Sequence, residues 1–183
     1  MKSFKLSNWV LAGWLLAVGC NRPGAATADA TGAQPTATES AAADSPENQP
    51  QPKLPTMKLW LGPKSIAAEI ASTSAQWQKG MMFRTNVTDQ EGMLFVFPRP
   101  AQQAFWMHNT LIPLSCAYID SEGVILEIHD MVPRDENPIK AATDQVQYVL
   151  ETQKGWFEKN QVKVGVAVAT ERGSLKETFF GKR

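Results

Sequence analysis

Four residues of this chain carry side chains that suit the binding of a small ligand: Arg84, Trp106, Asn109 and Thr110. Arginine has a permanent positive charge and a planar fork of donors that matches a carboxylate or a phosphate. Tryptophan supplies an apolar ring with one N–H donor, and asparagine can order a loop while it presents an amide. Together these residue types predict a cleft with an aromatic wall, an amide donor and a fixed cation.

The same residues also have a purely structural interpretation, which stays open at this point. Arg84 would then form an internal ion pair with Asp120 or Glu91, because a buried charge needs a partner. The aromatic segment Phe105–Met107 would fill the core, and the asparagine would shape a turn. The two interpretations differ in a measurable way. In a binding site the arginine lacks a fully satisfying carboxylate partner, and the tryptophan is partly exposed.

A second chemistry is suggested by the two histidines of the chain, each of which has a methionine nearby. Met107 directly precedes His108, and Met131 follows His129. Imidazole and thioether groups are ligands that suit Cu(I). The spacing matches no copper-carrier motif that we recognise, so Cu(I) handling is kept as an alternative and no metal site is predicted.

Motifs of the common catalytic and cofactor-binding sites do not occur in the sequence. There is no Gly-x-Ser-x-Gly elbow, no His-Glu-x-x-His zinc motif, no phosphate loop and no dinucleotide fingerprint. A triad of Ser115, His108 and Asp120 can be drawn, but only their nearness in the sequence supports it. We therefore expect a non-enzymatic binding or accessory module without a cofactor, and we keep an envelope enzyme of unrecognised type as an alternative.

The N-terminal residues 1–19 have the pattern of a secretory signal. Two lysines precede an apolar stretch over residues 9–18, which is shorter than the ~20 residues of a membrane-spanning helix. Small residues and Cys20 follow and resemble the lipobox of bacterial lipoproteins, although Ala17 stands where leucine is usual. The alternative is an ordinary cleaved signal or a membrane anchor. We expect an exported protein anchored by lipid at Cys20, on the periplasmic face of the outer membrane because Asn21 follows the cysteine.

The rest of the chain divides by composition into a tether, a domain and a tail. Residues 20–56 have too little apolar surface to offset the entropy of ordering, so we expect a disordered tether. Residues 57–170 suffice for one hydrophobic core, and in the tail, residues 171–183, Phe179 and Phe180 could pack back. With 18 basic and 18 acidic residues the chain is near neutral, which argues against a nucleic-acid partner. The expected partners are the membrane, through the lipid, and a small ligand or an envelope protein.

Short alternating segments separated by turn signals predict a domain made mainly of strands. A helix is expected over residues 73–83, and one helical turn over residues 156–160. Cys116 lies between apolar neighbours and is expected to be a small buried core residue. The predicted fold class is a compact antiparallel β-sandwich or barrel-like domain with one or two short helices. The strands are expected at residues 57–61, 65–71, 92–97, 103–107, 114–119, 124–128, 146–150 and 162–169.

Several segments in a fixed order resemble the domain of unknown function 192 (DUF192) family. The resemblance covers about residues 57–168 and implies a small secreted or lipid-anchored bacterial protein with a β-rich fold and no established activity. The chain departs from the family pattern at His108 and Ser115, where lysine and aspartate are usual, and at Val166, where aspartate is typical. If the lysine and the first aspartate form a functional pair in the family, this chain has lost it. The matching segments are GMMFR (80–84), EGMLFVF (91–97), FWMHNTLIPL (105–114), AYID (117–120), VQYVLE (146–151) and GW (155–156).

Overall fold

The fold is that of a computed structural model, which describes residues 48–181. These residues belong to one compact unit of the chain. The expected signal, the lipidation site Cys20 and most of the expected tether lie outside the described residues. Among the described residues, no helix has the length and apolar character needed to cross a membrane.

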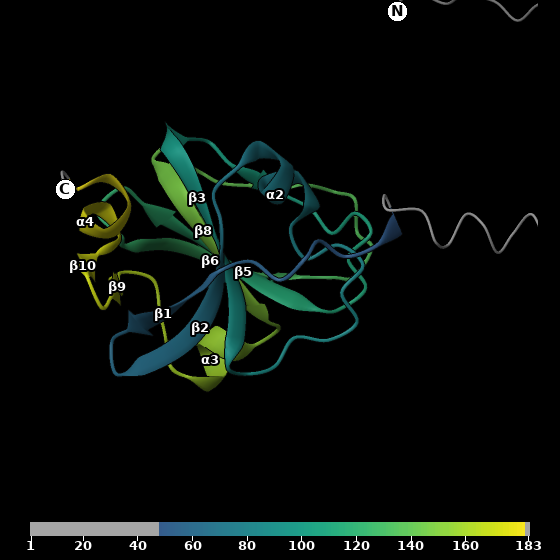
Figure 1. The fold of residues 1–183 in the computed structure, drawn as a ribbon, viewed down its shortest axis with the longest axis horizontal. Coiled ribbons are helices and arrows are strands. Elements are labelled where there is room, and N and C mark those ends of the chain that lie inside the picture. The colour runs from purple at the N-terminus through teal and green to yellow at the C-terminus, as the bar shows by residue number, and fades with distance from the viewer. Residues whose placement is uncertain (1–47, 182–183) are drawn as a thin grey trace, which may run out of the picture. The chain divides into compact units, whose positions relative to one another are not determined.

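A curled sheet of eight strands forms the frame of the domain, in the order β10-β9-β1-β2-β3-β8-β5-β6 (Figure 1). A bridge between Val124 and Ala167 connects the two outer regions of this order, but the sheet does not close into a barrel. The strands are β1 (Thr56–Leu61), β2 (Lys64–Ala71), β3 (Glu91–Ala101), β5 (Leu114–Asp120), β6 (Ile125–Met131), β8 (Val146–Gln153), β9 (Val168–Thr170) and β10 (Gly173–Ser174).

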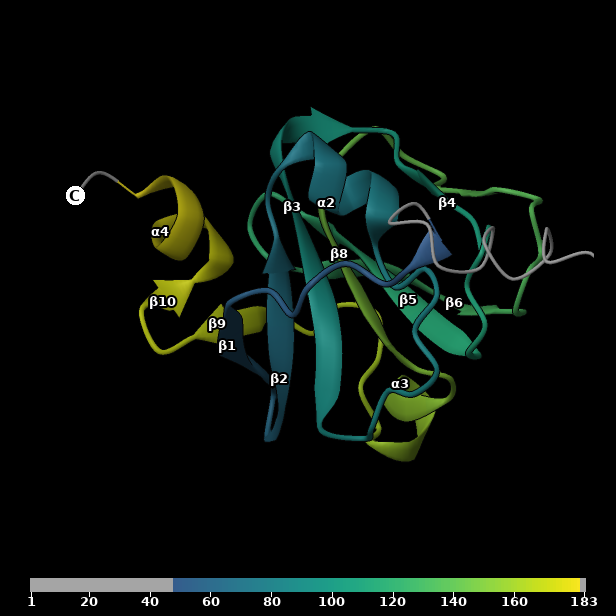
Figure 2. The ribbon, with the colours of Figure 1, turned by 45° about the vertical axis from the view of Figure 1, so that its right-hand side comes forward.

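A small second sheet and three short helices complete the domain. The second sheet pairs β4 (Ala104–Phe105) with β7 (Ile139–Lys140). The helices are α2 (Ser74–Lys79), α3 (Trp156–Lys159) and α4 (Leu175–Phe180). Figure 2 shows α2 and α3 toward opposite ends of the large sheet and α4 beside β10. The mainly β, sandwich-like fold class is therefore confirmed.

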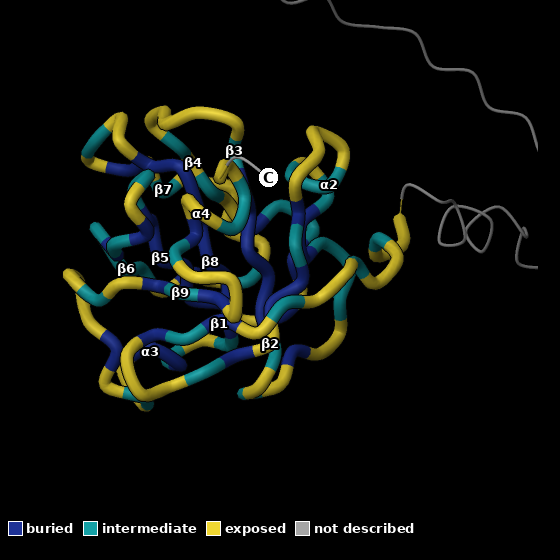
Figure 3. Tube along the Cα trace, turned by 60° about the vertical axis from the view of Figure 1, so that its left-hand side comes forward, coloured by how far each residue is buried: buried dark blue, intermediate teal, exposed yellow. Residues whose placement is uncertain are grey.

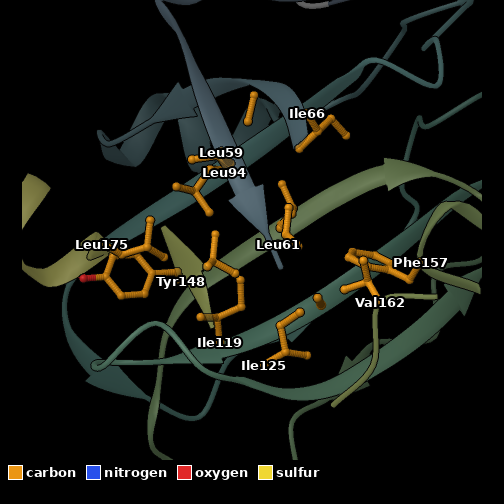
Figure 4. Packing of buried hydrophobic residues seen from close by; sticks show 14 of the residues in the cluster. Leu59, Leu61, Ile66, Leu94, Ile119, Ile125, Tyr148, Phe157, Val162 and Leu175 are labelled. Atoms are coloured by element: carbon orange, nitrogen blue, oxygen red, sulfur yellow. The ribbon is translucent and has the colours of Figure 1, made fainter. Parts of the chain in front are cut away.

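The large sheet separates two clusters of buried residues, and Figure 3 shows how burial follows its strands. Strand side chains alternate between the two faces of a sheet, so neighbouring residues of one strand enter different clusters. The packed core contains Leu94 and Leu150, and Figure 4 shows it closing around Tyr148 and Leu175. The second cluster contains Phe95, Val149 and Tyr118. It is called the cavity-side core, because the cavity described in the next subsection lies on this face of the sheet.

The connection from β2 to β3 crosses over the cavity-side core because these two strands run parallel. It contains α2, which is capped by Thr73. The Thr73 hydroxyl accepts a hydrogen bond from the backbone N–H of Gln76, and the Gln76 side chain accepts one from the backbone N–H of Thr73. The helix ends at Gly80, whose φ of 45° suits glycine better than any residue with a Cβ.

Both ends of the described segment pack on the domain. Before β1, Gln51 donates from its side chain to the Gly80 carbonyl at 2.8 Å, although the sequence assigns this stretch to the tether. In the tail, Leu175 is fully buried, and the rings of Phe179 and Phe180 each lie 6.2 Å from the ring of Tyr148. Phe179 packs against the buried cluster as expected, whereas Phe180 remains 42% exposed.

Candidate functional site

Four side chains form a row across the large sheet on the cavity side. Strand register pairs Glu69 of β2 with Met93 of β3, Met93 with Glu151 of β8, and Glu151 with Cys116 of β5. Paired residues of neighbouring strands direct their side chains to the same face. The row therefore places two carboxyl groups and a thiol among buried apolar side chains, where a charge is disfavoured unless it is paired.

Arg84, from the loop after α2, neutralises the first of these carboxylates. Its Nη1 donates to Glu69 Oε1 at 2.6 Å and its Nη2 donates to Glu69 Oε2 at 2.8 Å, in the bidentate arrangement that suits arginine. The backbone N–H of Leu54 donates a further hydrogen bond to Glu69 Oε2 at 2.7 Å. Arg84 thus forms an internal ion pair, as the structural interpretation expects, but its partner is Glu69 and neither Asp120 nor Glu91.

Glu151 has no comparable partner. Its side chain is buried, and its Oε2 accepts no hydrogen bond within residues 48–181. Burial raises the pKa of Glu151 to about 8, and the positive charge of Arg84 opposes this increase only in part. Both Nη groups of Arg84 already donate to Glu69, so two carboxyl groups share one guanidinium. At neutral pH Glu151 is mostly protonated and can donate a hydrogen bond as well as accept one.

A cavity of about 200 Å³ lies beside Glu151, which forms part of its lining. The aromatic rings around it hold one another in place. Phe105 lies edge-on to Phe95 with ring centroids 4.9 Å apart, and the ring of Trp77 lies 5.0 Å from that of Phe97. The large apolar side chains of the lining are Trp77, Met81, Met82, Phe95, Phe97, Phe105 and Trp106.

Two of the predicted site residues, Trp106 and Thr110, line this cavity. Trp106 is 48% exposed, as the binding interpretation expects, and its ring stacks on that of His108 with centroids 5.0 Å apart. Thr110 is buried, and its hydroxyl donates to the carbonyl of His108 at 3.2 Å. The two residues thus place an indole ring at the mouth of the cavity and a hydroxyl in its wall.

Asn109 and Arg84 are not among the residues that line the cavity; they support its walls. Asn109 adopts a φ of 51°, a left-handed conformation that asparagine tolerates better than most residues. Its carbonyl accepts a hydrogen bond from the backbone N–H of Phe83 at 2.8 Å. This bond joins the loop after α2 to the turn that carries Trp106 and Thr110, so Asn109 fixes the two walls relative to each other.

The residues of the Cu(I) alternative are already engaged in the protein. His108 Nδ1 is hydrogen-bonded to Glu136 at 2.7 Å, and His129 Nε2 is hydrogen-bonded to Glu127 at 2.9 Å. The side chains of Met107 and Met131 are buried in the cavity-side core. Within residues 48–181, no group of three or more His, Cys, Asp or Glu side chains is arranged to hold a metal ion.

Cys116 is a free cysteine in the same core, fully buried as predicted. Burial raises the pKa of its thiol, and the carboxyl group of Glu151 adds to this effect. A thiol is nucleophilic only as the thiolate, so we expect Cys116 to be unreactive in the folded protein.

The long connection over residues 133–144 supports the cavity from outside. The backbone N–H of Met107 donates to the carbonyl of Asp135 at 2.8 Å, and the N–H of Ala141 donates to the carbonyl of Gln103 at 2.9 Å. Tyr118 donates from its hydroxyl to the carbonyl of Ile139. These bonds fasten the connection to the segment that carries Trp106.

Sequence reasoning did not identify Glu69 and Glu151 as site residues. Both occupy strand positions where the alternating pattern calls for an apolar side chain. A carboxyl group at such a position is the signal that could have found them, because a buried acid needs a partner or a function. The partner of Glu69 comes from a distant loop, which the strand pattern does not reveal.

Comparison with known proteins places most of the domain in one family. The model of the DUF192 family, described as Uncharacterized ACR, matches residues 58–170. This range begins in β1 and ends in β9, so it includes the whole lining of the cavity. No curated protein matches the chain.

The solved structures similar to this chain include two bacterial proteins. A protein of unknown function from Novosphingobium aromaticivorans is 35% identical, with a TM-score of 0.59 over 63% of this chain and 85% of its own. A Sinorhizobium meliloti protein, named as a candidate transcription regulator, is 29% identical, with a TM-score of 0.63 over 66% of this chain and 97% of its own. The likeness supports the fold and the family match.

Proposed function

Because the chain belongs to the DUF192 family, whose description names no activity, we propose a function from the site itself: the domain is a non-enzymatic binding module for a small ligand. The cavity beside Glu151 holds this ligand. One observation carries the proposal, namely the buried carboxyl group of Glu151, which lines an aromatic cavity and has an oxygen without a hydrogen bond in the described residues. A binding site commonly combines apolar walls with a few polar groups that fix the orientation of the ligand.

The size of the cavity limits the ligand. Pockets for drug-sized molecules usually enclose ~300–1,000 Å³. A cavity of about 200 Å³ suits a smaller molecule or one headgroup of a larger molecule. Trp106 at the mouth can cover such a ligand, because its ring is already partly exposed and stacks on His108.

The proposal includes the cellular place of the domain. Lipid attached at Cys20 anchors the mature protein, and the tether presents the domain to the periplasm. The lipobox-like sequence supports this part. Replacement of Cys20 by serine, followed by cell fractionation, tests it. We expect the variant to leave the membrane fraction, and an unchanged distribution would contradict the anchor.

Ligand-detected NMR on the full-length protein in lipid nanodiscs tests the binding module. A library of small aromatic and aliphatic fragments is screened against the wild type, Trp106→Ala and Trp60→Ala. Trp60 is a partly exposed tryptophan of β1 that does not line the cavity, so it is the matched control. We expect fragments that bind the wild type and Trp60→Ala and bind Trp106→Ala at least ~10-fold more weakly, a loss of about 1.4 kcal/mol. Equal binding to all three proteins would overturn the cavity as the site.

An enzyme is the second candidate, and the raised pKa of Glu151 is the observation that favours it. A carboxyl group with a pKa of about 8 can exchange protons with a substrate near neutral pH. Small molecules from envelope extract, incubated with the wild type or with Glu151→Gln and then compared by mass spectrometry, separate the candidates. Conversion that requires Glu151 supports an enzyme. Retention without conversion supports the binding module.

A further inference from the structure

We propose that the ligand of this cavity is a small organic cation with a methylated ammonium group, which pairs with the carboxylate of Glu151 between aromatic rings. This inference rests on the proposed function, because it names the class of ligand that the same cavity holds. It draws on the charge balance of the cavity side of the sheet, on the chemistry of the walls and on the size of the cavity.

When Glu151 is ionised, the cavity side of the sheet holds two carboxylates and one guanidinium, and one more cation balances the charge. Arg84 donates from both of its Nη groups to Glu69, at 2.6 and 2.8 Å. The exposed fraction of Glu151 is 4%, and its Oε2 accepts no hydrogen bond from the described chain. A buried carboxylate without a partner is costly, so a ligand that brings a positive charge supplies what the protein lacks.

The walls favour a methylated ammonium over a primary one. A primary ammonium has three N–H donors, each of which needs an acceptor when it is buried. The bulky side chains of the lining are five aromatic rings and the thioethers of Met81 and Met82, and the side-chain acceptors beside Glu151 are the amides of two glutamines and the hydroxyl of Thr110. Methyl groups on the ammonium pack against such walls, while the positive charge interacts with the ring faces, as in aromatic cages that bind quaternary ammonium groups. Trp77 of α2, Phe97 of β3 and Trp106 after β4 supply rings from separate segments, so they can surround the group.

Lys79 is the basic residue of the cavity lining, and its own contact is compatible with a positively charged ligand. Its ammonium lies over the ring of Phe83, 4.7 Å from the centroid. It is therefore engaged at a ring that is not part of the cavity lining. Glu151 and the aromatic rings of the lining remain as the groups that face the ligand.

A matched pair of probes tests the role of the charge. Choline carries a trimethylammonium group, and 3,3-dimethylbutan-1-ol has the same shape with a neutral carbon in place of the nitrogen. Both are titrated by calorimetry into the full-length protein in nanodiscs at about pH 9, above the pKa of about 8 of Glu151. We expect choline to bind at least ~10-fold more tightly than the neutral isostere.

Two variants locate the effect. Glu151→Gln keeps the shape of the side chain and removes its charge, so we expect it to abolish the preference for choline and leave the binding of the isostere unchanged. Glu158→Gln, at an exposed position of α3, is the control and should preserve the preference. Equal binding of the two probes to the wild type overturns the cation and leaves the proposed binding module standing. If neither probe binds, the cation is overturned whatever the fragment screen shows.

A third probe identifies the source of the cation. Glycerophosphocholine carries the same trimethylammonium group with the phosphodiester of a lipid headgroup. Glu151-dependent binding of glycerophosphocholine at an affinity similar to that of choline assigns the site to a lipid headgroup. Binding of choline alone assigns it to a free small cation. Both results support a methylated ammonium ligand, and binding that does not depend on Glu151 contradicts it.

Discussion

The two faces of the large sheet are built from the same strands and have opposite character. In β8, Leu150 enters the packed core, while its neighbour Glu151 lies on the cavity side. In β2, Ile66 and Ala68 enter the packed core, while Glu69 faces Arg84. The packed core is closed by apolar side chains from its own strands and from α3 and α4. The cavity side has a carboxyl group among its buried residues, and it has a cavity that the surrounding side chains do not fill.

This difference assigns the stability of the domain mainly to the packed core and the proposed function to the cavity side. Close packing of apolar side chains stabilises the fold and requires no partner. A buried acid without a counter-ion lowers stability, so its presence calls for another role.

Arg84→Ala should lower the free energy of unfolding by about 3–5 kcal/mol, because it leaves the buried carboxylate of Glu69 without its cation. Thermal and urea denaturation of the full-length protein measure the loss. Lys53→Ala is the control: Lys53 pairs with Glu91 at 3.2 Å on the surface, where an ion pair contributes at most about 1 kcal/mol. If both variants lose an equally small free energy of unfolding, the ion pair of Arg84 with Glu69 does not stabilise the cavity side of the domain.

Glu151→Gln should stabilise the protein, and more so at high pH. The pKa of Glu151 is raised in the folded protein from 4.5 to about 8. The folded state therefore binds more protons than the unfolded state between these values, and wild-type stability falls as pH rises from about 4.5 to about 8. The glutamine removes this dependence, so at pH 8 the variant should be more stable than the wild type by a free energy on the order of 1 kcal/mol or more. Melting curves across this pH range measure it.

Leu150→Met, one residue away on the packed face, is the control for this pH dependence. A swap of similar volume in a core costs less than about 1.5 kcal/mol. Because neither side chain titrates, the cost should be the same at low and high pH. A stability gain for Glu151→Gln that does not change with pH would show that burial does not perturb this carboxyl group.

Cys116 should resist alkylation in the native protein. Its thiol is fully buried, and burial raises its pKa, so little thiolate is available to react. Iodoacetamide labelling at about pH 8, followed by mass spectrometry of the peptide that contains Cys116, should show labelling only after denaturation in urea. Rapid native labelling would mean that the cavity side opens readily to solvent.

The smallest effect is expected from Cu(I). His108 and His129 are each hydrogen-bonded to a glutamate, and Met107 and Met131 are buried. Titration against a competing chelator should therefore give an affinity no better than that of a free peptide with one methionine and one histidine. Tight one-to-one binding that is lost in His108→Ala and His129→Ala would instead support the copper alternative.

The sequence predicts the strands well where their side chains alternate over several residues. β1, β2, β5 and β8 are found within a few residues of their observed bounds, because alternating or largely apolar runs of this length between turn signals indicate strands. β4 and β7 have two residues each, too few for any periodicity. The closing strand is expected over residues 162–169, but only β9 (Val168–Thr170) forms there. The strand begins later because Gly165 turns the chain with a φ of 88°.

The site is predicted less completely, for a physical reason. Trp106 and Thr110 stand out because an aromatic segment followed by a turn is unusual within a strand-rich domain. Glu151 resembles the last polar residue of a strand until the register places it between Met93 and Cys116. Ion pairs such as that of Arg84 with Glu69 depend on which loops cross which strands, and local patterns do not contain this information.

The parallel pairing of β2 with β3 has a consequence for the evolution of the family. Parallel neighbours require a long crossover, and here that crossover carries Trp77, Met81 and Met82 over the sheet. These residues lie outside the ladder of strand pairs, so substitution there leaves strand register intact. A lineage can therefore change the size and chemistry of one cavity wall by mutation in the crossover while it inherits the sheet unchanged. We expect the sequences of relatives to diverge faster in residues 72–90 than in the packed core.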